Sequence, residues 1–440
     1  MALGTRLIRN TAMLTASSLL MRIIGLIFQV WLAGRIGAAG IGLFQLVMSV
    51  GMLANTVAIS GIRFAGTRLL SEELGAHRPG GVKHGMRRCI LYALFFGLSS
   101  SVILLCCAKP LGFLWIGDGR TVLSLKIFAF TLPFTALNAA WSGYFTAVGE
   151  IWKSAVSGIA EEIGRTILVV AFLSAVPAGN ITLSCAAIVS GGLAAEIFGT
   201  FVRLALARKI RFGEGRQPAS PRLTPRLLGI ALPLAVSAYA RSSLSMLQNL
   251  LVPRGFRASG LSADRALADY GIIQGMVMPI VFFPSCLLLA LAELLVPELT
   301  EAQVQGRLDH IREMTSALLK KCLLFSLAIC ALLWAFAYPL GSAIYRNAEA
   351  GHFIRIFVPL IPIMYMDMVI DGCLKGLGQM MFSMGINILE ALLGVILVIS
   401  LLPAFALNGY IAVLYIGELL NFALSLGKLR SVLQPKTRSA

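Results

Sequence analysis

Long apolar stretches joined by short polar connections run through the whole chain. A helix needs about 20 predominantly apolar residues to cross the hydrocarbon layer of a membrane, and twelve stretches meet this requirement. We expect membrane-spanning helices over residues 11–34, 41–64, 89–108, 121–147, 154–176, 182–206, 227–253, 270–296, 317–338, 353–376, 382–404 and 408–427. The first stretch follows two arginines as in a signal peptide, but it is too long for one, and we interpret it as a retained helix. The pattern predicts an all-α membrane protein with twelve transmembrane helices.

The second half of the chain repeats the first. An offset of 219 relates Ala12, Ala16, Ser18 and Arg22 to Ala231, Ala235, Ser237 and Arg241. After the first two predicted helices an offset of 229 relates Gly42, Gln45, Pro133, Gly143, Gly149 and Glu161 to Gly271, Gln274, Pro362, Gly372, Gly378 and Glu390. The offset increases because the first connection is longer in the second half, where it covers 254–269, than in the first half, where it covers 35–40. The repeat predicts two six-helix lobes, 1–212 and 227–440, joined by a proline-containing cytoplasmic linker at 213–226.

The Lys and Arg residues of the connections predict the orientation in the membrane. The termini and even-numbered connections, with the eighth connection counted to residue 321, together carry 22 of them, whereas the odd-numbered connections carry 7. Because cytoplasmic loops retain positive charge, we expect both termini in the cytoplasm of a bacterial cell and a multi-pass protein of the plasma membrane. Six helices per half bring both halves into the membrane in the same sense, an arrangement found in secondary transporters with a substrate site between the repeats.

Composition agrees with this prediction. The chain is 58% apolar and 13% charged, with a mean hydropathy of +0.85, whereas soluble domains are about 45–50% apolar and about 25% charged. The net charge of +17 lies along one membrane face, so topology and anionic lipid head groups explain it better than nucleic acid does.

The sequence contains no pattern that indicates an enzyme, a metal site or a cofactor. The eight cysteines form no CxxC pair and the four histidines form no cluster, so we interpret the cysteines as small core residues. No GxxxxGK[ST] motif is present to cradle ATP phosphates, and no nucleophile has catalytic partners nearby in sequence. We therefore expect no enzymatic activity, no bound metal and no cofactor.

Two arginines at equivalent positions of the repeat are the sharpest candidates for binding. Arg22 lies about 16 Å into the first helix, near the middle of the membrane, and Arg241 is its counterpart in the seventh. Two guanidinium groups facing a cavity would offer bidentate donors to a phosphate or diphosphate. The alternative is that each pairs with a carboxylate or with helix carbonyls as a structural element. Arg63, Asn138 and Asp367 complete the set of candidate substrate-binding residues.

Glu161 and Glu390 form a second repeat-related pair and are candidates for proton or ion coupling. Arg165 follows Glu161 by four residues, so an ion pair within the helix is the favoured interpretation there. The same spacing predicts a pair between Asp371 and Lys375, whereas Asp367 has no cation nearby in sequence. Other intramembrane charges lie closer to helix ends, where snorkelling usually suffices; these are Arg63, Glu196, Arg203, Glu293 and Glu418. The glycines at 143, 149, 372 and 378 are expected to permit close helix contacts and tight turns.

Several segments resemble known flippases. The stretch LAGRIGAAGIGLFQLVMSVGMLANTVAISGIRFAGTRLLSEELG (32–75) is similar to the first hairpin of polysaccharide-biosynthesis flippases, particularly the branch like stage V sporulation protein B. The resemblance extends to FFPSCLLLALAELLVPELTEA (282–302), LKGLGQMMFSMGINILEALLGVILV (374–398) and NGYIAVLYIGELLNFALSL (408–426). It implies the multidrug/oligosaccharidyl-lipid/polysaccharide exporter fold, in which two lobes form a V that opens alternately to either side, and polyprenyl-diphosphate-linked saccharides as substrates.

The resemblance is incomplete at the residues that bind diphosphate in the lipid II flippases of this superfamily. MRIIG keeps Arg22, but Phe28 and Gln29 stand where those proteins have a further Arg and an Asp, and Pro279 stands where they have an Arg. The sequence therefore predicts a monomeric flippase for a lipid-linked oligosaccharide, driven by the membrane potential or by a proton or sodium gradient. The alternatives are a cation-coupled multidrug exporter of the same fold and an envelope polymerase or ligase.

Overall fold

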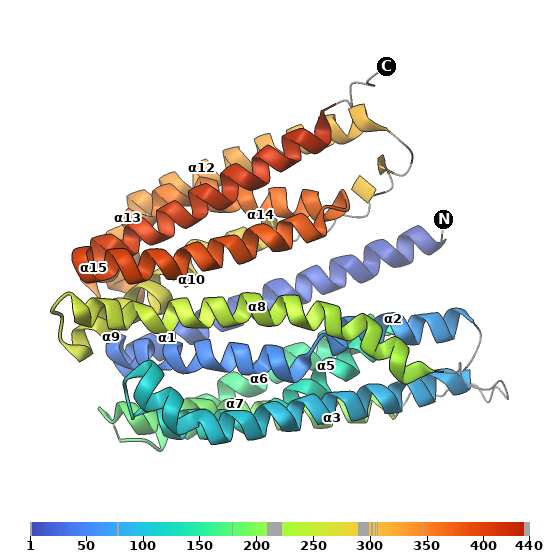
Figure 1. Cartoon of the computed structure of the whole chain (residues 1–440), viewed down its shortest axis with the longest axis horizontal. Coiled ribbons are helices and arrows are strands. Elements are labelled where there is room, and N and C mark those ends of the chain that lie inside the picture. Colours follow the sequence, from blue (N-terminus) through green and yellow to red (C-terminus); the bar gives the residue numbers. More distant parts are fainter. Residues whose placement is uncertain are drawn as a thin grey trace. The chain divides into compact units, whose positions relative to one another are not determined.

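The computed structural model describes the chain except for residues 1, 77–78, 178, 209–221, 289–298, 301, 304, 306, 346 and 435–440, and it does not describe the side chains of residues 2–15 and 79. Every regular element in the described part is a helix (Figure 1). Seven of these helices are long and apolar enough to cross a membrane, or eight if the bent pair α4 and α5 is one span. The number is below twelve partly because some helices contain two predicted spans.

Two long helices each contain two predicted spans. Helix α1 (Ala2–Ile59) is interrupted at Gly37, where φ is 71° and ψ is 175°, between the first and second predicted spans. Helix α15 (Met380–Leu433) is interrupted at Ala406, where φ is 47° and ψ is −122°, between the eleventh and twelfth. The other predicted spans also coincide with helices, although residues 289–296 of the eighth lie outside the described part.

The chain forms two compact units. Unit 1 contains Met1–Phe28 and Leu43–Met246, and unit 2 contains Gln29–Gly42 and Leu247–Ala440. The first 24 residues of α8 (Leu223–Ala258) thus lie in unit 1, although the repeat relates this helix to the start of α1. The predicted lobe boundary within 213–226 stays a prediction, because most of that segment is outside the described residues.

Unit 1 is a bundle in which neighbouring spans pack as antiparallel pairs. Its further helices are α2 (Ile62–Gly75), α3 (Pro79–Pro110), η1 (Leu111–Ile116), α4 (Thr121–Ala129), α5 (Leu132–Ala147), α6 (Ile151–Ser174) and α7 (Ile181–Ala207). Helices α2, α3 and α5 pack against one another, α6 packs along α7, and α7 also contacts α4 and α5. The α5–α6–α7 region surrounds the polar network described below.

Unit 2 is built in a similar way. Its helices, besides the ends of α1 and α8, are α9 (Ala263–Gly271), η2 (Ile272–Val277), α10 (Met278–Phe282), α12 (Leu308–Tyr345), α13 (Ala348–Phe357), η3 (Val358–Leu360), α14 (Ile361–Gly376) and α15. Helix α12 packs against α13 and α14, and α14 packs against α15. Polar side chains cap three helix starts across the two units: Asn180, Ser262 and Asn347 accept hydrogen bonds from backbone N–H groups of α7, α9 and α13.

Glycines at equivalent positions of the repeat end equivalent helices. Gly149 follows α5 with φ 75°, and Gly378 follows α14 with φ 71°. Both occupy the left-handed region that glycine adopts without the steric penalty of a side chain. Gly143 has a different role, because a Cβ atom placed there would lie 2.6 Å from the carbonyl oxygen of Arg63. The close contact and the tight turns expected from sequence are both present.

Candidate functional site

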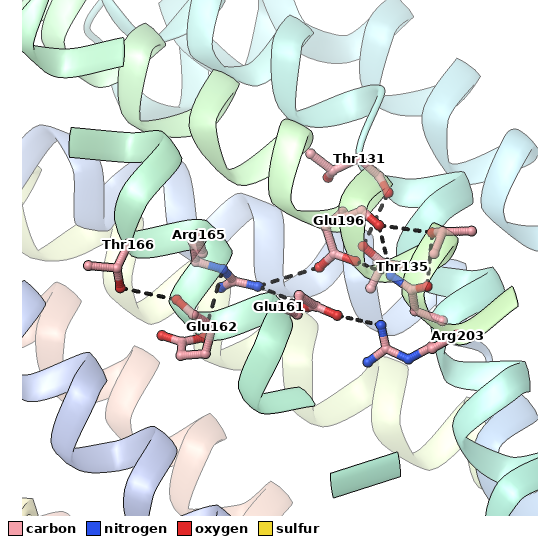
Figure 2. A network of polar contacts seen from close by, with 10 residues as sticks. Thr131, Thr135, Glu161, Glu162, Arg165, Thr166, Glu196 and Arg203 are labelled. Carbon is pink, nitrogen blue, oxygen red and sulfur yellow. Dashed lines mark hydrogen bonds and ion pairs between the residues drawn. The ribbon is translucent and has the colours of Figure 1, made fainter. Parts of the chain in front are cut away.

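A network of charged and polar side chains lies inside unit 1, on α5, α6 and α7 (Figure 2). Glu161 of α6 accepts hydrogen bonds from two arginines. Nη1 of Arg203 lies 2.5 Å from one carboxylate oxygen, and Nη2 of Arg165 lies 3.3 Å from the other. Nε of Arg165 also lies 3.9 Å from Oε2 of Glu162, and Nη2 of Arg165 lies 3.6 Å from Oε1 of Glu196. One guanidinium group is therefore shared among three carboxylates.

The network continues onto α5 through Asn138. Nδ2 of Asn138 donates to Oε2 of Glu196 at 2.8 Å and to the Glu196 carbonyl oxygen at 3.1 Å. The hydroxyl of Thr200 donates to Oδ1 of Asn138 at 2.9 Å. Both polar groups of the Asn138 amide are thus engaged within the unit. Asn138 is buried, and its role as a substrate ligand stays a prediction.

The formal charges of this network do not cancel. It holds the carboxylates of Glu161, Glu162 and Glu196 and the guanidinium groups of Arg165 and Arg203, so full ionisation leaves one negative charge in excess. The Arg203 side chain is only 8% exposed, and those of Glu161 and Glu196 are 13% exposed. Buried charges are tolerated only when they are paired and hydrogen-bonded, so these contacts hold α5, α6 and α7 together.

A second polar cluster lies inside unit 2, on α14 and α15. Nδ2 of Asn421 donates to Oε2 of Glu390 at 2.7 Å, and the hydroxyl of Ser425 donates to Oδ1 of Asn421 at 3.3 Å. Asp367 interacts with Ser425 and is only 9% exposed, and its Oδ1 has no hydrogen-bond partner in the described part of the chain. Glu418 lies close enough to interact electrostatically with Glu390 and Asp367. This cluster is rich in carboxylates.

The two clusters occupy equivalent positions of the internal repeat. An offset of 229 relates Asn138 to Asp367 and Glu161 to Glu390, and an offset of 225 relates Glu196 to Asn421 and Thr200 to Ser425. Amide and carboxylate have therefore exchanged places between the halves: α5 carries the amide in unit 1, whereas α15 carries it in unit 2.

The arginines of unit 1 have no counterpart in unit 2. Gly394 stands at the position equivalent to Arg165, and Lys428 at the position equivalent to Arg203. A Cβ atom at Gly394 would lie 2.7 Å from the Gln248 side chain, and the Lys428 ammonium lies over the Phe382 ring. In the described part of unit 2 no arginine or lysine forms an ion pair with Asp367 or Glu418. Unit 1 therefore has a cation-neutralised cluster and unit 2 an acidic one.

The predicted arginine pair is exposed. Arg22 and Arg241 are both exposed, and neither forms an ion pair with a described residue. Arg22 lies next to Met21, whose sulfur would lie 3.4 Å from a Cβ atom at Gly158 of α6. One turn further along α1, a Cβ atom at Gly25 would lie 3.8 Å from the Glu162 carboxylate. Arg22 is thus carried by the face of α1 that borders the α6 side of the network.

Arg241 lies on the part of α8 that packs against α1 within unit 1. The neighbouring Tyr239 shares a hydrogen bond of 2.6 Å with Ser60, and Ser242 accepts one of 3.2 Å from Thr56. Arg63, at the start of α2, is exposed and also lacks an ion pair with a described residue. A guanidinium group in the middle of the membrane cannot be left in lipid without a partner. At the depth predicted from the sequence, the surfaces around Arg22 and Arg241 would therefore need water or an anion.

The structure corrects one interpretation of the sequence and supports two. The ion pairs expected at four-residue spacing are present, at 3.3 Å for Glu161 and Arg165 and at 2.5 Å for Asp371 and Lys375. Snorkelling is wrong for Arg203, because it is buried and bound to Glu161 on the neighbouring helix, and Glu196 likewise bonds inward to Asn138. Glu293 lies outside the described residues. The sequence did contain a signal for these inward contacts, because α7 carries two intramembrane charges of opposite sign, Glu196 and Arg203.

Comparison with known proteins places the chain in a family. The model of the polysaccharide biosynthesis protein family matches residues 7–303, and a model of the MatE family matches residues 233–399. The chain belongs to the polysaccharide biosynthesis protein family. The sequence is 22% identical to stage V sporulation protein B of Bacillus subtilis (strain 168) over 411 residues, which cover 91% of this chain and 79% of that protein. It is 18% identical to sporulation protein YkvU of the same organism over 377 residues, covering 85% and 83% of the two chains.

Solved structures show the same fold. The inward closed conformation of the lipid II flippase MurJ matches with a TM-score of 0.72 and 13% identity, over 94% of this chain and 87% of that one. An inward-facing multidrug resistance transporter of the MATE family matches with a TM-score of 0.73 and 13% identity, over 96% of both chains. The predicted fold, twelve transmembrane helices in two six-helix repeats, is confirmed, and the protein is a multi-pass membrane protein.

Proposed function

We propose that this protein is a flippase that moves a polyprenyl-diphosphate-linked oligosaccharide, a precursor of peptidoglycan or of another polysaccharide, from the inner to the outer leaflet of the bacterial cytoplasmic membrane. The observation that carries the proposal is a pair of exposed, unpaired arginines at equivalent positions of the repeat, Arg22 and Arg241, in a member of the polysaccharide biosynthesis family. The relatives whose names state an activity are transporters or flippases and not enzymes. The similarity to two sporulation proteins supports a role in sporulation.

The two arginines would bind the diphosphate. A guanidinium group presents a planar fork of N–H donors that matches the oxygens of a phosphate, and such charge-assisted bonds are stronger than neutral ones. The prenyl chain would stay in lipid while the head group passes through water near the arginines. Arg63 is a third candidate contact, nearer the cytoplasmic end. Alternating access would then expose the head group to each side of the membrane in turn.

We assign the coupling role to the cluster of unit 2. The Glu161 carboxylate is already held by Arg165 and Arg203, whereas Asp367 has a buried oxygen with no partner in the described part of the chain. A buried carboxylate with one unpartnered oxygen gains more from a proton or sodium ion than one that two guanidinium groups neutralise. Glu390 and Glu418 would complete the site for this ion. Asp367 is therefore better placed for coupling than for binding the saccharide.

Leaflet-resolved transport in proteoliposomes tests the substrate-binding arginines. A fluorescent prenyl-diphosphate saccharide is incorporated, and its appearance in the other leaflet is followed for the wild type, Arg22→Ala and Arg241→Ala. We expect each substitution to slow transport about tenfold or more, the loss expected from one charge-assisted contact. Arg120→Ala is the control, because Arg120 already pairs with Asp118 at 2.7 Å. Normal transport by both test variants would contradict the assignment.

The coupling role is tested by imposing a proton or sodium gradient on the same vesicles. We expect Asp367→Asn to retain transport down the substrate gradient and to lose stimulation by the ion gradient, whereas Glu161→Gln retains the stimulation. Gradient stimulation that survives in Asp367→Asn would remove the coupling role from unit 2.

A cation-coupled multidrug exporter is the second candidate. The acidic cluster of unit 2 and the structural similarity to multidrug transporters favour it. Such a protein exchanges a drug cation for a proton or sodium at a carboxylate, whereas Arg22 and Arg241 would repel a cation. Counterflow of a lipophilic cationic dye in the same vesicles separates the two functions. Dye transport without saccharide transport would favour the exporter.

A further inference from the structure

An arginine of unit 2 is stacked on two aromatic rings. The guanidinium carbon of Arg355, on α13, lies 3.9 Å from the ring centre of Trp334 and 5.6 Å from that of Tyr338. Both rings belong to α12 and are one helical turn apart. We call Trp334 and Tyr338 the aromatic shelf. A cation over an aromatic face is attracted by the negative charge density of the ring, so the shelf holds the guanidinium group in a defined orientation.

The hairpin formed by α12 and α13 brings these side chains together. A Cβ atom at Gly341 would lie 2.3 Å from the backbone nitrogen of Gly351, so the two helices touch near their connection. A Cβ atom at Gly351 would lie 2.9 Å from the Tyr338 Cα atom. One turn further along each antiparallel helix, Trp334 comes opposite Arg355. The position of the guanidinium group is therefore set by backbone packing.

Stacking leaves the edge of the guanidinium group available. The shelf occupies one face, whereas the five N–H donors lie in the plane of the group and need acceptors. Arg355 makes no hydrogen bond and no ion pair with any described residue. Two other arginines on the side predicted to be external are neutralised: Arg120 pairs with Asp118, and Arg265 pairs with Asp269 and Glu349. The positive charge of Arg355 is therefore not neutralised by any described carboxylate.

The site lies on a surface that faces lipid. Trp334 is 49% exposed and Tyr338 is 48% exposed, and only 17% of the most apolar segment of α12 is buried. The ninth predicted span ends at 338 and the tenth begins at 353, so the site is at the level of the head groups. Tryptophan and tyrosine are enriched at this level. The abundant acceptor there is the phosphate of a phospholipid.

We propose that Arg355 and the aromatic shelf form a binding site for the phosphate group of a phospholipid in the outer leaflet. The rings orient the guanidinium fork, the phosphate oxygens accept its N–H groups, and the acyl chains lie along the apolar surface of α12. The inference is independent of the transported substrate. Lys126, which the offset of 229 relates to Arg355, is also exposed, but Leu105 and Lys109 stand at the shelf positions. The first half therefore repeats the charge without the shelf.

Lipid binding to the delipidated full-length protein tests this site. Phosphatidylglycerol is titrated into the detergent-solubilised protein, and bound lipids are counted by native mass spectrometry for the wild type, Arg355→Gln and Trp334→Leu. We expect Arg355→Gln to weaken the tightest binding step about tenfold, and Trp334→Leu to weaken it by a smaller factor because the charge remains but its orientation is lost. Thermal unfolding without added lipid verifies that each variant is folded.

Arg265→Gln is the matched control, because it removes an arginine from the same side of unit 2 whose charge is already paired. Its lipid affinity should equal that of the wild type. Equal binding by Arg355→Gln and the wild type would overturn the proposal, as would an equal loss in Arg265→Gln. Unchanged binding by Trp334→Leu would remove the shelf from the site.

A competition experiment distinguishes a membrane phospholipid from the diphosphate of a transported lipid. Farnesyl diphosphate is added to the protein loaded with phosphatidylglycerol. We expect displacement only at a large excess, since a phosphodiester fits one guanidinium fork. Displacement at stoichiometric concentration in the wild type but not in Arg355→Gln would show that the site receives a prenyl diphosphate and would overturn the assignment to phospholipid.

Discussion

The polar contacts of the two units differ in whether the sequence alone could predict them. The pairs Glu161–Arg165 and Asp371–Lys375 could be predicted because four residues form one helical turn and neighbours on a turn face each other. The pair Glu161–Arg203 could not, since its members are 42 positions apart and meet only when α6 packs along α7. The exchange of amide and carboxylate between Asn138 and Asp367 is visible in the sequence, but only the structure shows that both side chains lie in polar clusters.

Removal of Arg203 tests the contribution of the network to stability. We expect Arg203→Met to lower the stability of the protein by about 3 kcal/mol, because Glu161 then keeps a buried charge with a single, longer contact to Arg165. Thermal unfolding in detergent measures the effect. The double variant Arg203→Met/Glu161→Gln should be less destabilised than the sum of the single variants. Additive losses would show that the two side chains do not interact.

The amide–carboxylate exchange predicts opposite effects at equivalent positions. Asn138→Asp places a carboxylate 2.8 Å from an oxygen of Glu196, so we expect a lower unfolding temperature from the repulsion. Asp367→Asn supplies an amide where unit 1 already has one, and it removes a buried charge, so we expect an unchanged or higher unfolding temperature. A lower temperature for Asp367→Asn would show that the carboxylate has a structural partner.

At the scale of elements, helix boundaries and contacts follow from small residues. The predicted break between the first two spans coincides with Gly37, and the turns after α5 and α14 coincide with Gly149 and Gly378. Sequence could locate these because glycine relieves the penalty of positive φ. It could not locate the break at Ala406, where a residue with a side chain adopts φ 47°. Nor could it show that α13 and α14 are separated by the short turn η3.

The contact between α2 and α5 can be tested with one methyl group. Gly143→Ala would place a Cβ atom 2.6 Å from the Arg63 carbonyl oxygen, so the helices must move apart, and we expect a loss of about 1–3 kcal/mol. Gly192→Ala in α7 is the control, because nothing lies within 4 Å of a Cβ atom there and alanine has the higher helix propensity. Unfolding curves of the two variants should shift in different directions. Equal shifts would contradict the close contact.

At the scale of the whole molecule, the repeat predicted the helix inventory but not the grouping of helices into compact units. Each half supplies six spans, as the sequence indicated. The compact units nevertheless include Gln29–Gly42 with unit 2 and the start of α8 with unit 1. Sequence periodicity reports which residues correspond, whereas the grouping depends on side-chain contacts, such as those of Arg226 with Glu72 and Glu73, that join distant segments.

The orientation in the membrane is also a prediction about the whole molecule. In a background without the exposed Cys106 and its neighbour Cys107, we introduce His84→Cys or Ala258→Cys, both at exposed positions. A membrane-impermeant maleimide should label Ala258→Cys in intact cells and His84→Cys only after permeabilisation, because positive charge keeps the latter connection in the cytoplasm. The reverse pattern would invert the topology.

Helix α8 contributes residues to both compact units. Its first part is fastened to unit 1 by hydrogen bonds from Thr56 and Ser60 and by ion pairs of Arg226, and its last part belongs to unit 2. Residues of this one helix thus belong to both units, as do residues of α1. Cutting the polypeptide between α7 and α8 would not release independent halves, and a gene split at that point would encode two fragments that need each other to complete their cores.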